Sequence, residues 1–294
     1  MDPPLTLADT VVAIMRKQFP EELADGSWDN TGLLLGTAPP SSSSLVVDEA
    51  LKENTRIIIC YHPVIFRPLK SLTTEDPMQT QLLRLAAERI SVYCPHTAMD
   101  AALGGLNDWL CDLLTQGVDA EPVFRRAIQP VSSKPAPPEH QGAGYGRVMT
   151  LPQKVDLHTL LRRLNAGTTG SPYAMVATPS HIRNSDASNP PMIGRIAVCA
   201  GSGAGVFKDL GDDNDVELLV TGEMSHHDAL RHTQLGRVVA TVFHSNSERR
   251  YLRDVLKPVL EGKLRGTPFG DTTRVIVSQA DRDPFDIINI GPVA

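Results

Sequence analysis

Residues 238–248 read VVATVFHSNSE. The first six are apolar or β-branched and predict a buried strand, and the polar stretch from His244 to Glu248 follows where that strand ends and a helix begins. Three other predicted strands end in the same way, on the sequences YHP (61–63), PHTAMD (95–100) and TGEMSHH (221–227). This arrangement predicts an α/β protein in which polar side chains gather at the ends of strands.

Strands and helices alternate along most of the chain. Strands are predicted at 56–60, 91–94, 147–151, 195–199, 216–220, 238–243 and 273–278. Helices are predicted at 7–19, 77–89, 106–114, 157–164, 224–231 and from 247 onward. Because helical crossovers return the chain to the starting edge of a sheet, parallel pairing is favoured. We expect two α/β lobes with mixed sheets, divided into an N-terminal lobe (1–125), an irregular middle segment with one short helix (126–190) and a C-terminal lobe (191–294).

The composition favours a soluble globular protein. Apolar residues make up 41% and charged residues 21% of the 294 residues, a balance typical of globular domains. The net charge of −6 argues against direct nucleic-acid binding, which needs a basic face. No apolar run approaches the roughly 20 residues of a membrane-spanning helix, and the first residues lack a secretion signal. We therefore expect a cytoplasmic protein without a membrane partner, with the nucleus or the mitochondrion as alternative compartments.

Histidines gather beyond the carboxyl ends of the predicted strands. His62, His96, His226, His227 and His244, out of nine histidines in the chain, lie there. In open α/β sheets this edge binds ligands, because the loops converge on a crevice. Two carboxylates, at positions 100 and 248, lie in the same loops. Imidazole nitrogens with carboxylates suit Zn, Fe, Mn or Ni better than Ca or Mg, and predict one or two divalent ions per chain.

Each of these histidines and carboxylates also has a purely structural interpretation. His62 precedes Pro63, which favours extended geometry and suits a turn residue. Asp100 could orient His96 without touching a metal ion. The sequence Ser245-x-x-Glu248 fits a helix capping box, so the carboxylate could serve only helix amides.

The adjacent pair His226-His227 diverges by about 100° on a helix, so only one of the two is expected to reach a shared site. The glycine-rich stretch 201–205 (GSGAG) follows a predicted strand, but the third glycine of a dinucleotide fingerprint falls on Val206. We interpret it as a tight loop that brings backbone close to a ligand. No serine nucleophile elbow is present in this sequence.

Several blocks of sequence, in order along the chain, resemble one known family. They are WDNTGL (28–33), YHP (61–63), IFRP (65–68), PHTAMD (95–100), GLNDWL (105–110), GYGR (144–147), AGSG (200–203), TGEMSHH (221–227) and HSNSE (244–248). The family is the NIF-three-like family (NGG-one-interacting factor three), whose bacterial members are also labelled GTP cyclohydrolase I type 2 homologues. The resemblance implies two α/β lobes, a dinuclear metal site in the cleft between them, and a homo-oligomer in the form of a hexameric ring.

By position, the family's metal ligands correspond to His62, Asp100, His244 and Glu248, and the motif residues near the site include His96 and His226. Two departures stand out. Tyr61 replaces the first of two consecutive histidines found in many members, and a phenol with a pKa of about 10 is a poorer ligand. We therefore expect one well-held ion and a weak or absent second one. The stretch Thr37–Leu45 is too short for a further strand that the family usually has there.

The leading hypothesis is a metal-dependent hydrolase in which a metal-bound water is the nucleophile. His96 and His226 are the candidate catalytic residues, which would orient ligands or move protons. The alternative is a non-catalytic, metal-stabilised interaction protein that binds a transcription factor and acts in transcriptional regulation. A GTP cyclohydrolase activity is disfavoured, because no residue that would read a purine can be placed.

Overall fold

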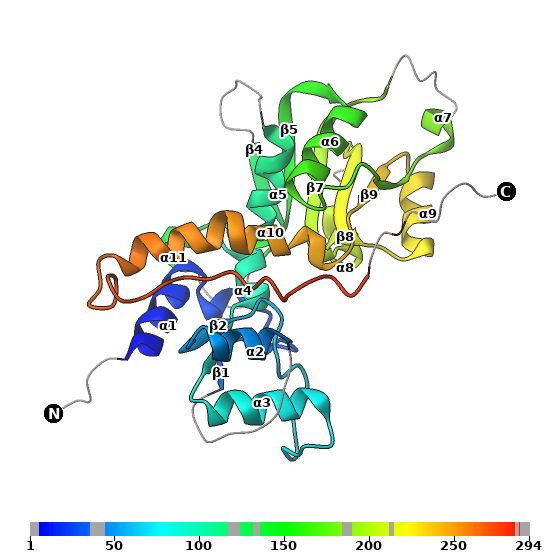
Figure 1. The fold of residues 1–294 in the computed structure, drawn as a ribbon. Coiled ribbons are helices and arrows are strands. Elements are labelled where there is room, and N and C mark those ends of the chain that lie inside the picture. Colours follow the sequence, from blue (N-terminus) through cyan, green and yellow to red (C-terminus); the bar gives the residue numbers. More distant parts are fainter. Residues whose placement is uncertain are drawn as a thin grey trace.

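The computed structural model describes residues 6–35, 45–116, 124–131, 136–183, 190–211, 215–285 and 288. Their strands form two sheets, one of three strands and one of six. The two sheets lie in separate lobes. Three helices lie where the lobes meet, namely α4 (His96–Ala101), α10 (Arg249–Tyr251) and α11 (Lys257–Leu264) (Figure 1). None of the helices in these ranges is long and apolar enough to cross a membrane.

The three-stranded sheet belongs to the N-terminal lobe and has the order β1-β3-β2. β1 is antiparallel and β2 parallel to the central β3. One face is covered by α2 and α3, whose apolar residues pack on Ile90 and Val92. The elements are β1 (Gly32–Leu35), α2 (Leu45–Lys52), β2 (Ile57–Ile59), α3 (Pro77–Ala87) and β3 (Ser91–Cys94).

Local sequence signals set the helix starts of this lobe. α1 (Leu7–Gln18) begins with the predicted capping box, in which Thr6 and Asp9 satisfy each other's backbone amides. α3 begins as predicted at Asp76, whose carboxylate accepts a hydrogen bond from the amide of Gln79, and Pro77 occupies its first turn. Short-range chemistry thus fixes where these helices begin.

The six-stranded sheet has the order β4-β5-β7-β8-β9-β6. The central strands β7, β8 and β9 are parallel, whereas β4, β5 and β6 pair antiparallel with their neighbours. Both sheets are therefore mixed, as predicted. The strands are β4 (Phe124–Pro130), β5 (Gly144–Asp156), β6 (Met175–Ala177), β7 (Met192–Ser202), β8 (Leu218–Glu223) and β9 (Val238–Thr241).

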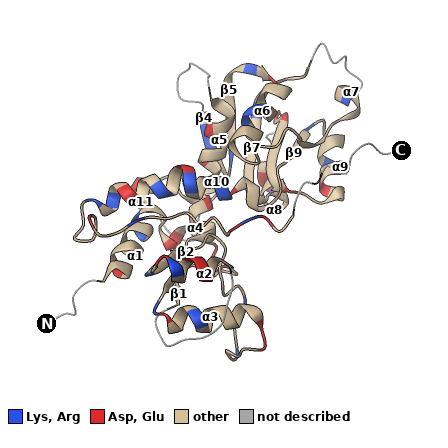
Figure 2. Ribbon diagram, viewed as in Figure 1, with Lys and Arg blue, Asp and Glu red and all other residues tan. Residues whose placement is uncertain are grey.

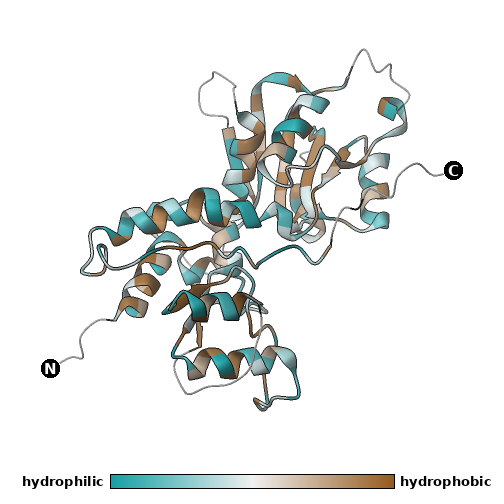
Figure 3. Cartoon of the chain, in the orientation of Figure 1, coloured by the Kyte–Doolittle hydropathy of each residue, from teal (hydrophilic) through white to brown (hydrophobic). Residues whose placement is uncertain are grey.

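Helices cover both faces of this sheet. α5 (Leu106–Thr115) and α6 (Leu157–Gly167) pack on one face, where they meet Leu218 and Val220 of β8. On the other face Phe207 of α8 (Ala204–Phe207) packs with Leu219, and α9 (His226–Gln234) lies over β9. Charged side chains lie mainly on helices and loops, while the central strands carry apolar ones (Figures 2 and 3). Alternate strand residues therefore serve two apolar layers.

Two sequence predictions need correction. The middle segment, in which one strand (147–151) and one short helix were expected, contributes β5, β6 and most of β4 to the large sheet. The second half of β5 is partly exposed and polar, so its sequence lacks a clear apolar alternation. The predicted strand 273–278 is not a strand, because its backbone pairs with no strand of the described chain. The stretch expected to be too short for a further strand, Thr37–Leu45, lies outside the described residues up to Ser44.

The predicted long helix after residue 247 consists of three parts. α10 (Arg249–Tyr251) runs into a π-helical turn (Leu252–Leu256) and then into α11 (Lys257–Leu264). Pro258 cannot donate a hydrogen bond and its ring would clash with the carbonyl four residues earlier, which the wider π turn relieves.

A buried ion pair holds α5 on the six-stranded sheet. The guanidinium of Arg147 on β5 is 1% exposed and donates to both carboxylate oxygens of Asp108 on α5, at 2.9 and 3.1 Å. It also donates to the carbonyls of Gly144 and Ala102. These bonds replace the ones that water would otherwise make. Loss of the arginine would leave the largely buried Asp108 with the more distant Arg125, at 3.5 Å, and the Gly104 amide as partners.

We predict that Arg147→Met lowers the free energy of unfolding by about 3 kcal/mol, because Asp108 loses its closest cationic partner and keeps Arg125 at 3.5 Å and the Gly104 amide. Arg16→Met is the matched control, since Arg16 pairs with Glu21 but its side chain is 55% exposed, and it should change stability by less than about 1 kcal/mol. Urea unfolding measures both. Equal losses in the two variants would contradict a structural role for the buried pair.

Candidate metal centre

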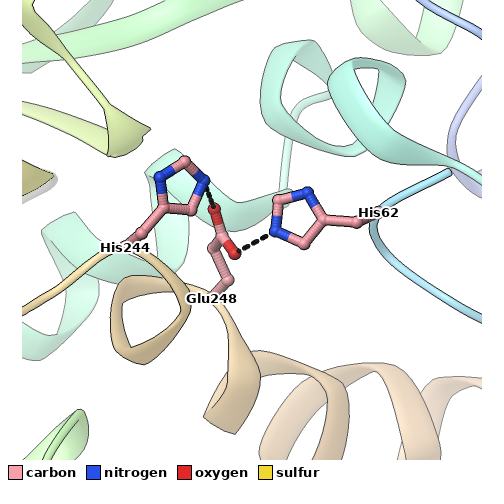
Figure 4. Close-up of side chains that lie close together, drawn as sticks. All are labelled: His62, His244 and Glu248. Carbon is pink, nitrogen blue, oxygen red and sulfur yellow. Dashed lines mark hydrogen bonds and ion pairs between the residues drawn. The ribbon is translucent and has the colours of Figure 1, made fainter. Parts of the chain in front are cut away.

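Three predicted ligands converge on one point. One ligand atom from each of His62, His244 and Glu248 lies within 4.8 Å of the other two (Figure 4). The Nε2 atom of His62 lies 2.9 Å from Oε2 of Glu248, and Nε2 of His244 lies 3.3 Å from Oε1. The carboxylate thus offers a different oxygen to each imidazole.

The three ligands come from both lobes. His62 follows β2 of the three-stranded sheet, and Pro63 comes directly after it. His244 lies just beyond β9 of the six-stranded sheet, and one 3-10 turn (Ser245–Ser247) separates it from Glu248. The cluster therefore exists only when the two sheets are packed together.

Glu248 does not act as a helix cap. No side chain caps the helical segments at this position, and the Ser245 hydroxyl bonds instead with Asp283 and Arg249. The Glu248 carboxylate is turned to the two histidines while the residue is only 3% exposed. The capping-box interpretation of this glutamate is therefore wrong.

A glycine makes room for the cluster. Gly201, at the end of β7, has a φ of +62°, and a Cβ atom there would lie 2.8 Å from Oε1 of Glu248 and 3.1 Å from Nε2 of His244. Its amide donates to the Ser247 hydroxyl at 2.8 Å. The end of β7 thus brings backbone against the cluster. The predicted tight loop at 201–205 is instead the last residues of β7 followed, after Gly203, by α8.

The electrostatics of His62 follow from its partner. Partial burial by itself lowers the pKa of the imidazole, but the hydrogen bond to Glu248 and the charges of Glu248 and Asp100 outweigh it. The pKa of His62 is therefore raised above its usual 6.5. The negative charges of Glu248 and Asp100 thus stabilise a positive charge on His62. A cation bound at this position would experience the same negative electrostatic potential.

Asp100 lies beside this cluster but is not part of it. It belongs to α4 (His96–Ala101), and its Oδ1 accepts a hydrogen bond from the Tyr61 hydroxyl at 2.7 Å. Burial raises the pKa of Asp100 to about 7, and the nearby charge of Glu248 adds to the effect, against the hydrogen bond from Tyr61. Burial, with the charge of Asp100, raises the pKa of Tyr61 well above 10. Tyr61 is thus a neutral donor that occupies one oxygen of Asp100.

His96 is held by a residue that sequence reasoning did not assign. Its Nδ1 lies 2.5 Å from Oδ1 of Asp29, whose side chain is fully buried. Asp29 also accepts hydrogen bonds from the amide and hydroxyl of Thr97. The His96 ring lies 5.3 Å from that of His62 between centroids. Asp29 stands in the WDNTGL block, but nothing in its spacing pointed to His96, 67 residues away.

The remaining histidines of the motif point elsewhere. His226 and His227 are exposed at the start of α9, with ring centroids 5.4 Å apart, and neither belongs to the cluster. Glu223, at the end of β8, instead contacts it: its Oε1 lies 3.0 Å from Nδ1 of His244. A carboxylate behind an imidazole fixes the tautomer and the direction of the ring. Sequence reasoning missed this role, although Glu223 lies in the TGEMSHH block.

Comparison with known proteins decides the family. The model of the DUF34/NIF3 family (NGG1p interacting factor 3) matches residues 6–284. The chain belongs to the DUF34/NIF3 family. It is 36% identical over 95% of its length to NGG1-interacting factor 3 of Saccharomyces cerevisiae, covering 96% of that protein. It is 38% identical to the NIF3 homolog of Schizosaccharomyces pombe, over 92% of this chain and 95% of that protein.

The fold of this NIF3-family chain is shared with solved structures. A Bacillus cereus protein related to NIF3 superimposes with a TM-score of 0.72 at 17% identity, covering 95% of this chain and 98% of that one. The predicted family resemblance and the mixed α/β architecture are therefore confirmed.

We predict that Gly201→Ala lowers the free energy of unfolding by about 1–3 kcal/mol, because an alanine is strained at this positive φ and its Cβ would press on Glu248 and His244. Gly205→Ala is the matched control: it lies in α8 and a Cβ there has open space, so it should be neutral or stabilise by about 0.5–1 kcal/mol. Thermal and urea unfolding test both. A neutral Gly201→Ala would show that the cluster is loosely packed.

Proposed function

We propose that this NIF3-family chain binds a divalent metal ion through His62, His244 and Glu248, and acts as a metal-dependent hydrolase. The observation that carries the proposal is the convergence of these three ligand atoms, within 4.8 Å of one another, from two separate sheets. An exposed acidic cluster would not imply a metal. Here a buried carboxylate lies between two imidazoles.

The residues fit a transition metal. Two imidazole nitrogens and a carboxylate form a donor set that suits Zn, Fe, Mn or Ni. His244 has Glu223 behind it, the outer carboxylate that ligating histidines usually have. Gly201 leaves beside His244 and Glu248 a space that any side chain would fill. Each of these features has a role in a metal site and none is needed for a simple ion pair.

Asp100 is the proposed fourth ligand. Its Oδ1 bonds to the Tyr61 hydroxyl at 2.7 Å, and the Tyr61 ring lies 4.8 Å from the His62 ring between centroids, so the carboxylate lies beside the cluster. Tyr61 competes for one of its oxygens, which favours a single well-held ion. A divalent cation supplies Lewis acidity, polarising a substrate oxygen and making water more nucleophilic at neutral pH. His96, whose ring is held by Asp29, is the candidate residue to hold or move a proton. His226 is exposed at the start of α9 and could take this role only if that end of the helix moved toward the cluster.

A second function is favoured by a specific observation. His62 comes from one lobe and His244 with Glu248 from the other, so a bound ion would cross-link the lobes and stabilise the chain without any reaction. The S. cerevisiae relative is named for its interaction with NGG1. We therefore keep as the alternative a metal-stabilised interaction protein with a transcription-related partner. Assembly into a homo-oligomer, with a hexameric ring as the expected form, also stays a prediction.

We predict that protein purified without chelator carries about one equivalent of Zn, Fe, Mn or Ni, and that His244→Ala and Glu248→Gln lose it. The reason is that each removes one of three converging donors. Glu223→Ala should keep the site but weaken metal affinity about 10–100-fold, since the outer carboxylate orients His244. Elemental analysis and metal titration measure these effects.

His227→Ala is the control for these variants, because His227 is exposed and outside the cluster. It should bind metal like the wild type. Metal at 100 times its dissociation constant should also stabilise the wild type by about 2.7 kcal/mol. A wild-type protein without metal, or a His227→Ala variant that loses it equally, would refute the proposed site.

A panel of cyclic and nucleotide phosphoesters, GTP and short peptides separates the two functions. For a hydrolase we expect metal-dependent turnover that Glu248→Gln abolishes and that His96→Ala reduces by about 10²–10⁴-fold, the usual contribution of a positioned acid or base. If no substrate turns over while metal raises the melting temperature and the Glu248→Gln variant still captures its partner, the interaction protein is the correct description.

A further inference from the structure

The segment 273–278, with its strand-like sequence TRVIVS, occupies an unusual position. It follows α11 and runs back between α11 and α2 (Figure 1), where Arg274 pairs with Glu53 and the Ser278 hydroxyl donates to Glu49. Val275 packs on the main apolar core, while Arg274 and Ile276 are exposed. The side chains thus alternate between the body of the protein and solvent, as in a β-strand.

Its backbone is nevertheless unpaired. Within the described chain, no hydrogen bond joins a backbone amide or carbonyl of residues 273–276 to any other group. An extended segment with free amides and carbonyls, rich in β-branched residues, is a template for the addition of another strand. Side-chain contacts with α2 hold it in place and leave its hydrogen-bonding groups available.

A groove of about 630 Å³ lies along this segment, between Thr273–Gln279 and α11. We call it the basic groove. Four cationic residues line it, namely Arg253, Lys257, Arg265 and Arg274, against one acidic residue, Glu261. Three of these cations pair with the carboxylates of Asp254, Glu261 and Glu53, whereas Arg265 makes no ion pair among the described residues. The groove therefore keeps a positive surplus, at Arg265, although the chain as a whole carries −6. The remaining lining is largely apolar and includes Leu264 and Val275 to Val277.

We propose that the basic groove is a docking site for an extended peptide in which acidic and apolar side chains alternate. The peptide would add as a strand to the segment 273–277, a span of roughly 16 Å at about 3.3 Å per residue. Its apolar side chains would face the lining near Leu264, and its carboxylates would meet the cationic rim. This site shares no residue with the metal cluster, so the inference is independent of metal binding.

Charge and shape favour this occupant over two others. A second copy of the chain would bring another unpaired Arg265 against this one, and like charges repel. Single-stranded nucleic acid needs aromatic side chains on which bases stack, and no aromatic residue lines the groove as the described chain forms it. An acidic, apolar peptide satisfies the charges, the apolar lining and the free backbone together.

The test uses the full chain and a short fluorescein-labelled peptide of alternating glutamate and valine, measured by fluorescence anisotropy. We expect saturable binding that weakens with added salt, because part of the attraction is electrostatic. Arg265→Glu should weaken it about tenfold, since Arg265 lines the groove and makes no ion pair among the described residues. Arg253→Glu serves as a second variant if the first does not fold.

Lys263→Glu is the matched control: Lys263 is exposed on the same helix, carries the same charge and does not line the groove. It should bind the peptide like the wild type. Amide hydrogen exchange should slow at residues 273–277 when the peptide binds, because strand addition protects their amides. A peptide of alternating lysine and valine should not bind.

Four results would overturn the proposal. They are absence of binding by the acidic peptide, equal weakening by Arg265→Glu and Lys263→Glu, peptide-induced protection elsewhere in the chain, and equal displacement of the peptide by polyglutamate or a single-stranded oligonucleotide. A groove-dependent dimer, seen by sedimentation and abolished by Arg265→Glu, would assign the groove to a second copy and would also overturn it.

Discussion

The buried carboxylate of Glu248 is the constraint around which the rest of the site is built. At 3% exposure an ionised carboxylate is costly unless positive or hydrogen-bonding groups surround it. His62 and His244 supply them from two lobes, and Gly201 withholds a side chain so that they can approach. The negative charge of Glu248 and Asp100 raises the pKa of His62. The same negative charge would also favour a bound cation between the imidazoles and the Glu248 carboxylate.

The packing of the two lobes is therefore part of the site. One apolar cluster runs from α1 through α5 and α6 to the strands of the six-stranded sheet, and Arg147 bonds Asp108 within it. Such a continuous core resists relative motion of the lobes, because close-packed interiors do not deform gradually. A rigid junction holds ligand atoms from different sheets a few ångströms apart, which a metal centre requires and a loose hinge would not provide.

The basic groove and the cluster of His62, His244 and Glu248 are both contacted by the segment that follows α11. The segment after α11 crosses back over the N-terminal lobe and then reaches the cluster side, where Asp283 bonds Ser245, three residues before Glu248. The segment thus packs against both lobes.

Local chemistry in the sequence determined a good part of this structure. The helix starts at Thr6, Asp76 and Asp156 follow from capping residues, and the apolar runs placed β3 and, within a few residues, the strands that end near the site. The strand-end pattern also pointed to three residues that the structure brings together, His62, His244 and Glu248, because each follows the carboxyl end of a strand at the junction of the two sheets.

What only the tertiary structure decided depends on partners distant in sequence. Whether TRVIVS pairs as a strand depends on a neighbour that the described chain does not offer, so β-propensity could not settle it. The partners Asp29 of His96 and Glu223 of His244 are set by loop packing across 67 and 21 residues. Tyr61 donates a hydrogen bond to one oxygen of Asp100. Glu248 contacts both His62 and His244 only when the two lobes are packed together. The sequence thus supplied the chemical groups and their strands, while long-range packing chose which of them touch, since contact depends on three-dimensional distance and not on spacing along the chain.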